Sequence, residues 1–238
     1  MPANTATSRL PARRRRLLHL YHRLSKHFGP RHWWPADHAW EMMVGAILTQ
    51  NTNWGNVEKV LIALKAANVL SVQKIARMPI RRLEKLIRSS GFFRQKAVRL
   101  QNLARVLQKN PDFYKQLTGK AKRKLPELRR QLLSMNGIGP ETADSMLLYA
   151  GAYPVFVVDA YTRRIGQRQG LFPFDNYQDV QAYFESALPK KAALYNEYHA
   201  LLVQLAKKYC KSRDPLCGAC PVNIGCAFAL GRKTHRSA

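Results

Sequence analysis

Residues 132–164, LLSMNGIGPETADSMLLYAGAYPVFVVDAYTRR, decide the fold. A helical segment ends near Asn136, the tight turn Gly137-Ile138-Gly139 follows, and Pro140 opens a second helix. Glycine permits positive φ and close backbone approach, and proline is favoured at the first position of a helix. The amides that begin the second helix lie at the positive end of its dipole, which makes the turn a candidate site for one phosphate group.

An isolated carboxylate, Asp159, follows this hairpin in an apolar and aromatic setting. A phosphate site followed by a carboxylate suggests an enzyme that acts on nucleic acid. In a simpler interpretation the glycine turn only connects two helices and Asp159 caps the helix at 160–169, since Asp is a good N-cap residue. A GxG pattern by itself favours the simpler interpretation, so the decision depends on the rest of the chain.

The charge of the chain favours a polyanionic partner. Lys and Arg number 40 against 14 Asp and Glu, which gives a formal charge of +26 over 238 residues. Neutralising phosphates releases counterions and gives strong, salt-dependent affinity for nucleic acid. A membrane surface would also attract this charge, but no apolar run of about 18 residues could span a bilayer. We therefore expect a nucleic-acid partner and no membrane partner.

The N-terminal region is rich in arginine, and its first acidic residue is Asp37. We expect residues 1–13 to be a disordered basic tail. The region resembles an organellar transit peptide in composition, but apolar residues recur at helical spacing from about residue 14 to residue 28, so this part belongs to the fold. No secretory signal is visible, and a cytoplasmic, nucleoid-associated protein is expected. Residues 227–238 are predicted to be a second basic tail.

Four cysteines fall within 17 residues near the C-terminus, with the spacing C-x6-C-x2-C-x5-C: Cys210, Cys217, Cys220 and Cys226. Two disulfides are possible in principle, but nothing else indicates an oxidising compartment. Four thiolates in one loop indicate zinc or an iron–sulfur cluster, and the spacing alone does not separate the two. Such a closed site would order a basic loop rather than bind substrate.

The periodicity predicts an all-α protein. Apolar positions recur at intervals of three and four residues in 39–50, 57–66, 80–87, 96–107, 126–135, 141–149, 160–167, 178–188 and 194–208. Val155-Phe156-Val157-Val158 is a short apolar run with strand character. His199 lies on an apolar helix face and is interpreted as a core residue without a catalytic role.

Helix–GIG–helix, Asp159 and the four-cysteine loop together resemble the helix-hairpin-helix DNA glycosylases of the endonuclease III type. The resemblance covers the chain from about residue 14 to Cys226. It implies a six-helix barrel lobe at 35–150 and a second lobe made of 14–34 and 151–226, with a damaged base flipped from double-stranded DNA into the cleft between them. It also implies a [4Fe–4S] cluster on the cysteines, a catalytic Asp159, and a monomer.

Glu141 departs from that family. In endonuclease III a lysine at this position forms a Schiff base with the sugar, and glutamate cannot form an imine. Glu141 also suits the first turn of a helix, where the dipole favours an acid. We therefore expect a glycosylase that uses water, without lyase activity.

Several segments are more similar to 3-methyladenine DNA glycosylase III: Trp33-Trp34-Pro35, residues 44–52, residues 90–97 and residues 137–144. That resemblance implies an alkylated-base pocket made by Trp33, Trp34 and Pro35, to which Trp40 or Trp54 could add walls. Packing between lobes is the alternative role for the tryptophan pair. An alkyl-base member of that family lacks the cysteine loop, which this chain has.

By resemblance to endonuclease III, Gln50 would fill the gap left by the flipped base; the alternative is an ordinary polar helix end. Gly137, Ile138, Gly139, Glu141 and Thr142 would bind the DNA backbone. Three functions follow: a monofunctional glycosylase for alkylated purines, an endonuclease III-type enzyme for oxidised or deaminated bases with or without lyase activity, or a non-catalytic iron–sulfur DNA-binding protein.

Overall fold

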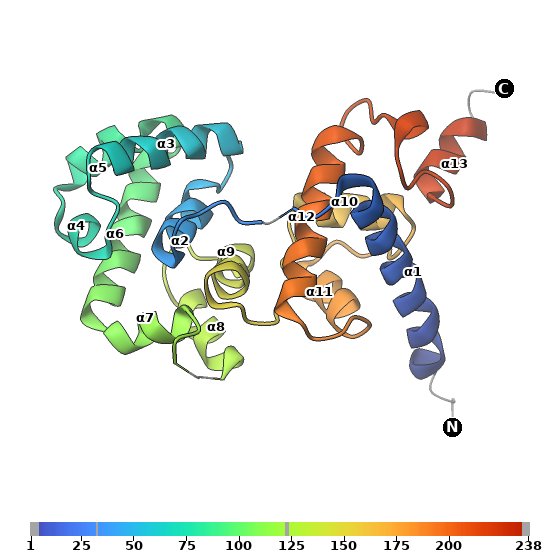
Figure 1. Cartoon of the computed structure of the whole chain (residues 1–238), viewed down its shortest axis with the longest axis horizontal. Coiled ribbons are helices and arrows are strands. Elements are labelled where there is room, and N and C mark those ends of the chain that lie inside the picture. Colours follow the sequence, from blue (N-terminus) through green and yellow to red (C-terminus); the bar gives the residue numbers. More distant parts are fainter. Residues whose placement is uncertain (1–4, 32, 122–123, 235–238) are drawn as a thin grey trace. The chain divides into compact units, whose positions relative to one another are not determined.

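The structure is a computed structural model that describes residues 5–31, 33–121 and 124–234 (Figure 1). Helices account for the regular structure of these residues and no strand occurs among them, so the predicted all-α class is confirmed. None of the described helices is both long and apolar enough to cross a bilayer. The chain divides into a central unit, Trp34–Tyr153, and a terminal unit, Met1–Trp33 with Pro154–Ala238.

The central unit contains eight α-helices among its described residues: α2 (Ala39–Leu48), α3 (Trp54–Ala66), α4 (Val72–Arg77), α5 (Ile80–Leu86), α6 (Phe93–Lys109), α7 (Pro111–Leu117), α8 (Leu125–Leu133) and α9 (Pro140–Ser145). A 3₁₀ turn, η1 (Arg88–Ser90), precedes α6, and a π-helical turn, η2 (Met146–Ala150), continues α9. The core helix is α2, which is buried from Trp40 to Leu48. A helix that is apolar on nearly all sides belongs in the interior of its unit, and the charged residue of α2, Glu41, is paired with Lys65 at 2.6 Å.

The terminal unit combines the first helix, α1 (Thr5–Phe28), with four helices from the other end of the chain: α10 (Ala160–Arg168), α11 (Tyr177–Glu185), α12 (Ala192–Lys208) and α13 (Ala227–Thr234). A 3₁₀ turn, η3 (Cys217–Ala219), lies in the cysteine loop. The buried helix α12 packs against both α1 and α10. Its Tyr198 hydroxyl donates a 2.9 Å hydrogen bond to the Leu17 carbonyl of α1.

The apolar run at 155–158 is extended and buried, but it forms no strand. Side chains of α11 take the place of a partner strand: the Phe156 amide donates to Glu185 Oε1 at 2.7 Å, and Gln181 Nε2 donates to the Phe156 carbonyl at 2.7 Å. The Phe156 ring stacks on Phe184 with centroids 4.2 Å apart. This segment leads directly into Asp159. Its backbone is hydrogen-bonded to side chains of α11, and its Phe156 ring packs on the same helix.

The predicted disordered tail at 1–13 is wrong for residues 5–13, which form the first turns of α1. Two arginines of α1, Arg13 in this stretch and Arg16 just after it, bind the chain beyond the ends of α11 and α10. Arg13 donates to Ser186 Oγ at 3.1 Å, and Arg16 donates to the Gly170 carbonyl at 2.9 Å. Within the predicted second tail, residues 227–234 form α13. Residues 1–4 and 235–238 of the two tails lie outside the described residues.

Candidate active site

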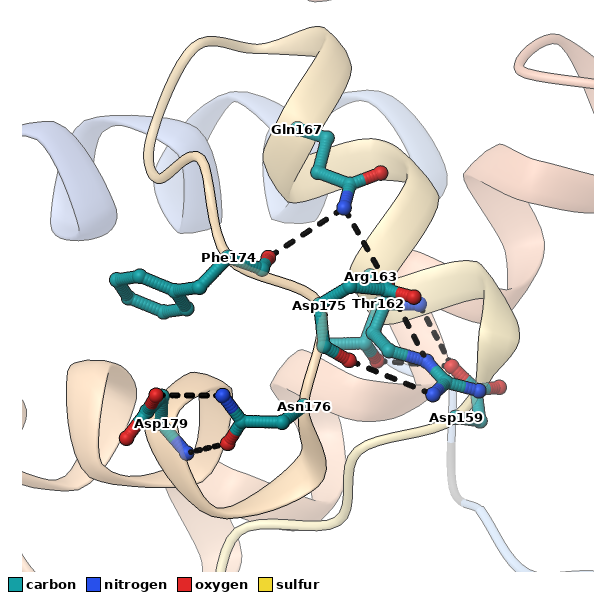
Figure 2. Close-up of polar contacts among 8 residues, drawn as sticks. All are labelled: Asp159, Thr162, Arg163, Gln167, Phe174, Asp175, Asn176 and Asp179. Atoms are coloured by element: carbon teal, nitrogen blue, oxygen red, sulfur yellow. Dashed lines mark hydrogen bonds and ion pairs between the residues drawn. The ribbon is translucent and has the colours of Figure 1, made fainter.

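Asp159 is the N-cap of α10, and its carboxylate is held by the first turn of that helix. Oδ1 accepts 2.7 Å and 2.8 Å hydrogen bonds from the Thr162 amide and hydroxyl (Figure 2). The simpler interpretation of Asp159 as a helix cap is therefore correct as far as Oδ1 is concerned. It leaves Oδ2 available for another function, with the side chain 14% exposed.

Oδ2 of Asp159 faces His199 on α12, with Nε2 of the imidazole 3.5 Å away. Burial raises the pKa of the Asp159 carboxyl, but His199 and the two hydrogen bonds from Thr162 lower it, and the net result is a pKa below its ordinary value. The carboxylate is therefore ionised at neutral pH although it is largely buried. His199 was interpreted from the sequence as a core residue. It is buried, but it also contacts the candidate catalytic group.

The loop that follows α10 is tied back to the helix (Figure 2). Gln167 Nε2 donates to the Phe174 carbonyl at 3.3 Å and to Asp175 Oδ1 at 3.2 Å. The Asn176 side chain then accepts a 2.8 Å hydrogen bond from the Asp179 amide and caps α11. These contacts fix α10 along its length, so the helix that starts at Asp159 has a defined direction.

The predicted hairpin is present in the central unit between α8 and α9. Gly137 has φ +82°, and the side chain of Arg99 lies where a Cβ at this position would be, so a larger residue would have a strained backbone and would displace Arg99. Nothing lies within 4 Å of a Cβ built at Gly139, which leaves that face of the turn open. Hydrogen bonding within α9 starts with the Ala143 amide, which donates to the Gly139 carbonyl at 2.9 Å.

A buried ion pair joins the two helices of the hairpin. Asp144 of α9 is 0% exposed and accepts two hydrogen bonds from Arg129 of α8, from Nε at 2.7 Å and from Nη2 at 3.1 Å. Two parallel hydrogen bonds between planar groups restrict both distance and orientation. The backbone of the turn is thus held by a side-chain pair that the sequence analysis did not identify.

Gln50 lies in the turn after α2 and is bonded to the hairpin. Its Nε2 donates to the Gly137 carbonyl at 2.9 Å and to Thr142 Oγ1 at 3.0 Å, and its Oε1 accepts a 2.5 Å hydrogen bond from Arg99. The side-chain amide therefore connects the loop that was predicted to enter DNA with the turn that was predicted to bind the DNA backbone.

Lys96, three residues before Arg99 on α6, supports the same loop from inside. It is 1% exposed, and its Nζ donates to the carbonyls of Leu48 at 2.8 Å and Ser90 at 2.7 Å. Burial, with a smaller influence from Arg99, lowers the pKa of Lys96 to about 8. The ammonium group thus satisfies carbonyls at the ends of α2 and η1 that would otherwise lack partners.

The tryptophan pair is divided between the two units. Trp34 packs in the central unit, with its ring centroid 5.2 Å from Trp54 and 5.4 Å from Tyr149. Trp33 lies in the terminal unit with Lys207 Nζ 5.8 Å from its ring centroid. Pro35 is exposed. Trp40 is 2% exposed and packs in the core of the central unit, and Tyr149 is an aromatic neighbour of Trp34 that the sequence analysis missed.

All four cysteines line one cavity of the terminal unit, together with apolar side chains such as Leu205 and Val222. Burial and the neighbouring thiols of Cys210, Cys217 and Cys226 raise the pKa of Cys220 to about 11, although the Val222 amide opposes the rise. Such a group of thiols favours a bound cation that would neutralise their thiolate forms. No three His, Cys, Asp or Glu side chains in the described ranges are spaced to hold a single metal ion.

The sequence of the chain matches a known family of repair proteins. Residues 44–190 match the HhH-GPD superfamily of base excision DNA repair proteins, so the chain belongs to that family. It is 42% identical over 208 residues to the Methanocaldococcus jannaschii protein MJ1434, whose name proposes a DNA repair glycosylase; the match covers 87% of this chain and 94% of the relative. Endonuclease III of Thermotoga maritima is 27% identical over 188 residues, which are 79% of this chain and 82% of the relative.

Two solved structures show the same fold. The Helicobacter pylori 3-methyladenine DNA glycosylase bound to 1,N6-ethenoadenine has a TM-score of 0.69 and 30% identity, and the match covers 82% of this chain and 95% of that one. A non-covalent endonuclease III–DNA complex has a TM-score of 0.79 and 22% identity, covering 93% and 98%. The predicted resemblance to helix-hairpin-helix DNA glycosylases is thereby confirmed, and the chain is a base excision repair glycosylase of this superfamily.

Proposed function

We propose that this glycosylase is monofunctional and releases alkylated purines from double-stranded DNA, acting as a monomer. Support comes first from the relative that was solved with 1,N6-ethenoadenine, since its match to this chain reaches 30% identity over 95% of its length. The single observation in this chain that carries the proposal is Glu141, an exposed acid in the first turn of α9 at the position of the Schiff-base lysine.

Asp159 would be the catalytic residue. Cleavage of an N-glycosidic bond develops positive charge on the sugar, and an ionised carboxylate stabilises that charge and orients or deprotonates the attacking water. The lowered pKa of Asp159 supports this role, since a protonated acid would do neither. Methylation at N3 or N7 makes a purine a cationic leaving group, so the enzyme needs little general acid.

An aromatic pocket would select the base. A cation over an aromatic face gains about 0.5–2 kcal/mol. Trp34, with Trp54 and Tyr149 against it, offers such rings in the central unit. Trp33 and Pro35 are proposed as further parts of the pocket. A base stacked on Trp33 would share this ring with the Lys207 ammonium group, which lies 5.8 Å from the ring centroid.

Lys96 is the described lysine whose pKa is clearly lowered, which favours nucleophilic amines, but the group is buried and donates to two carbonyls. Loss of those hydrogen bonds would open the end of α2. We therefore assign Lys96 a structural role and expect no imine.

Gly137, Ile138, Gly139, Glu141 and Thr142 are proposed to bind one DNA phosphate through main-chain amides, as helix N-termini do. Gln50 is proposed to fill the gap that the flipped base leaves. To enter DNA it would exchange its hydrogen bonds with Gly137, Thr142 and Arg99 for contacts with the opposite strand. Binding of the backbone at the hairpin and insertion of Gln50 would then be linked steps.

Cys210, Cys217, Cys220 and Cys226 are proposed to bind a [4Fe–4S] cluster. A single zinc ion draws its ligands to about 2.3 Å, whereas four irons spread four thiolates further apart. The cavity that all four cysteines line fits a group held by all four thiolates, as in the family that the cysteine loop resembles. Bound there, the cluster would order the loop beside α10 and take no part in base release.

The test is a lesion panel. Duplexes carrying N3-methyladenine, 1,N6-ethenoadenine, thymine glycol or uracil are incubated with the protein, and released base and strand cleavage are scored separately, with and without borohydride. Release of the alkylated purines without strand cleavage or a trapped complex is expected. Trapping of a covalent complex would refute the monofunctional assignment. Release of thymine glycol or uracil alone would favour the endonuclease III-type substrate class.

A further inference from the structure

The Asp159 carboxylate has two oxygens in different surroundings. Oδ1 is saturated by the Thr162 amide and hydroxyl, at 2.7 Å and 2.8 Å. These bonds come from the same helix turn and leave Oδ2 as the oxygen that can act on a reacting group. The neighbour of Oδ2 is Nε2 of His199, 3.5 Å away on α12. Among the described residues, His199 is the titratable side chain from another element that faces Asp159.

Packing of the core does not by itself explain a histidine at position 199. Its side chain is 7% exposed, and the residues before and after it, Tyr198 and Ala200, are buried on the same helix. A leucine would satisfy an apolar position of this kind without burying a polar ring. An imidazole that directs Nε2 towards the partly exposed carboxylate has a use beyond filling volume.

We propose that His199 is a positioning residue, which holds Oδ2 of Asp159 in one orientation for base release. This inference rests on the proposed function of Asp159 and assigns a partner to it. A carboxylate rotates about its last bond unless both oxygens are bound, and a misplacement of about 1 Å in a catalytic group can reduce the rate about 10²-fold. Thr162 holds one oxygen by two hydrogen bonds, and the His199 imidazole faces the other, with Nε2 3.5 Å away.

The backbone around His199 is rigid enough for this role. The Tyr198 hydroxyl bonds to the Leu17 carbonyl at 2.9 Å, and the Phe156 ring contacts both Tyr195 and Tyr198 edge-on. The segment that leads to Asp159 and the helix that carries His199 therefore pack directly on each other. Both residues belong to the terminal unit, so their distance is set within one compact body.

The electrostatic effect of His199 on Asp159 agrees with the geometry. Burial raises the pKa of the Asp159 carboxyl, and His199 is the first of the influences that lower it. Removal of the imidazole should therefore raise the pKa of Asp159. This change can be measured without any substrate, which separates the histidine's role from the identity of the lesion.

Three variants provide the test. His199→Leu removes the donor and keeps the volume similar, His199→Gln places an amide nitrogen near the position of Nε2, and Tyr198→Phe is the matched control that loses only a structural hydrogen bond. Single-turnover base release is measured on the lesion duplexes of the panel, together with the Kd for a duplex that holds a non-cleavable abasic analogue. The Asp159 carboxyl is titrated by ¹³C NMR in each protein.

We expect His199→Leu to slow release about 10–100-fold with Kd changed less than about 2-fold, and to raise the Asp159 titration midpoint. His199→Gln should recover most of the rate, and Tyr198→Phe should lower the melting temperature without either change. Unchanged rate and unchanged midpoint in a folded His199→Leu protein would overturn the inference while leaving the proposed function intact. If the wild-type protein releases no base, the proposed function fails, and the titration alone decides whether His199 controls Asp159.

Discussion

Arg129 and Asp144 form a two-point ion pair that joins α8 to α9 across the glycine hairpin, with Nε–Oδ1 and Nη2–Oδ2 distances of 2.7 Å and 3.1 Å. The aspartate is fully buried, whereas the arginine side chain is 25% exposed. The pair fixes the angle between the two helices, and with it the direction in which the start of α9 points. Stability and DNA binding should both depend on it.

Asp144→Ala should lower the free energy of unfolding by about 3–5 kcal/mol, because it leaves a guanidinium partly buried without its partner. Denaturant unfolding measures the change. The matched control is Asp112→Ala, which removes the exposed partner of the Lys115–Asp112 pair, 86% exposed, and should cost less than about 1 kcal/mol. Equal losses in the two variants would contradict a structural role for the buried pair.

Lys96→Met should destabilise the protein by about 1–3 kcal/mol at pH 7, since the carbonyls of Leu48 and Ser90 lose their donor. The difference should depend on pH. The folded-state pKa of about 8 lies below the unfolded value of about 10.4, so between these values the unfolded chain binds more protons and wild-type stability rises with pH. Urea unfolding of both proteins at pH 7, 8, 9 and 10 should show a growing gap; a constant gap would mean that Lys96 titrates normally.

Gln50→Ala should reduce base release more strongly from a paired lesion than from the same lesion placed opposite an abasic site. A side chain that fills the gap matters most where flipping breaks a base pair, which costs a few kcal/mol. The two duplexes serve as each other's control, because the chemistry and the phosphate contacts are the same. A loss of equal size on both would assign Gln50 to support of the hairpin through Gly137 and Thr142 instead.

The cysteine loop should contain iron. Purified protein is expected to show a broad visible absorbance band and about four iron atoms per chain by elemental analysis. Cys220→Ser should bleach the band and loosen the loop, which limited proteolysis would detect. Stoichiometric zinc in a colourless protein of full activity would refute the cluster assignment.

Much of the fold follows from sequence patterns, and the exceptions have physical causes. The helices at 160–167 and 194–208 were predicted within a few residues because apolar residues recur in them at intervals of three and four. Helices α4 and α7, with six and seven residues, were missed, although α5, which also has seven residues, was predicted. The tail at 5–13 was misread because charge density was taken as disorder, although these residues are helical and Arg13 donates to Ser186 in the C-terminal half of the chain.

The residues of the candidate site also divide into those that the sequence predicted and those that it did not. Asp159, the glycine turn and the four cysteines could be identified because each has a local pattern. His199, Arg129 and Lys96 could not, since their roles depend on partners 40, 15 and 48 residues away. The sequence feature that could have identified His199 was a polar residue inside an apolar helix. The sequence analysis interpreted that residue as part of the core.

In the proposed function, Asp159 performs the chemistry of base release. The most direct measurement is single-turnover release by Asp159→Asn on a duplex with N3-methyladenine or 1,N6-ethenoadenine, with Kd measured on the same DNA. The amide can still accept the Thr162 hydrogen bonds, so the helix cap should survive. Release should fall by at least about 10²-fold with Kd nearly unchanged. Release at the wild-type rate by a folded Asp159→Asn protein would contradict the account.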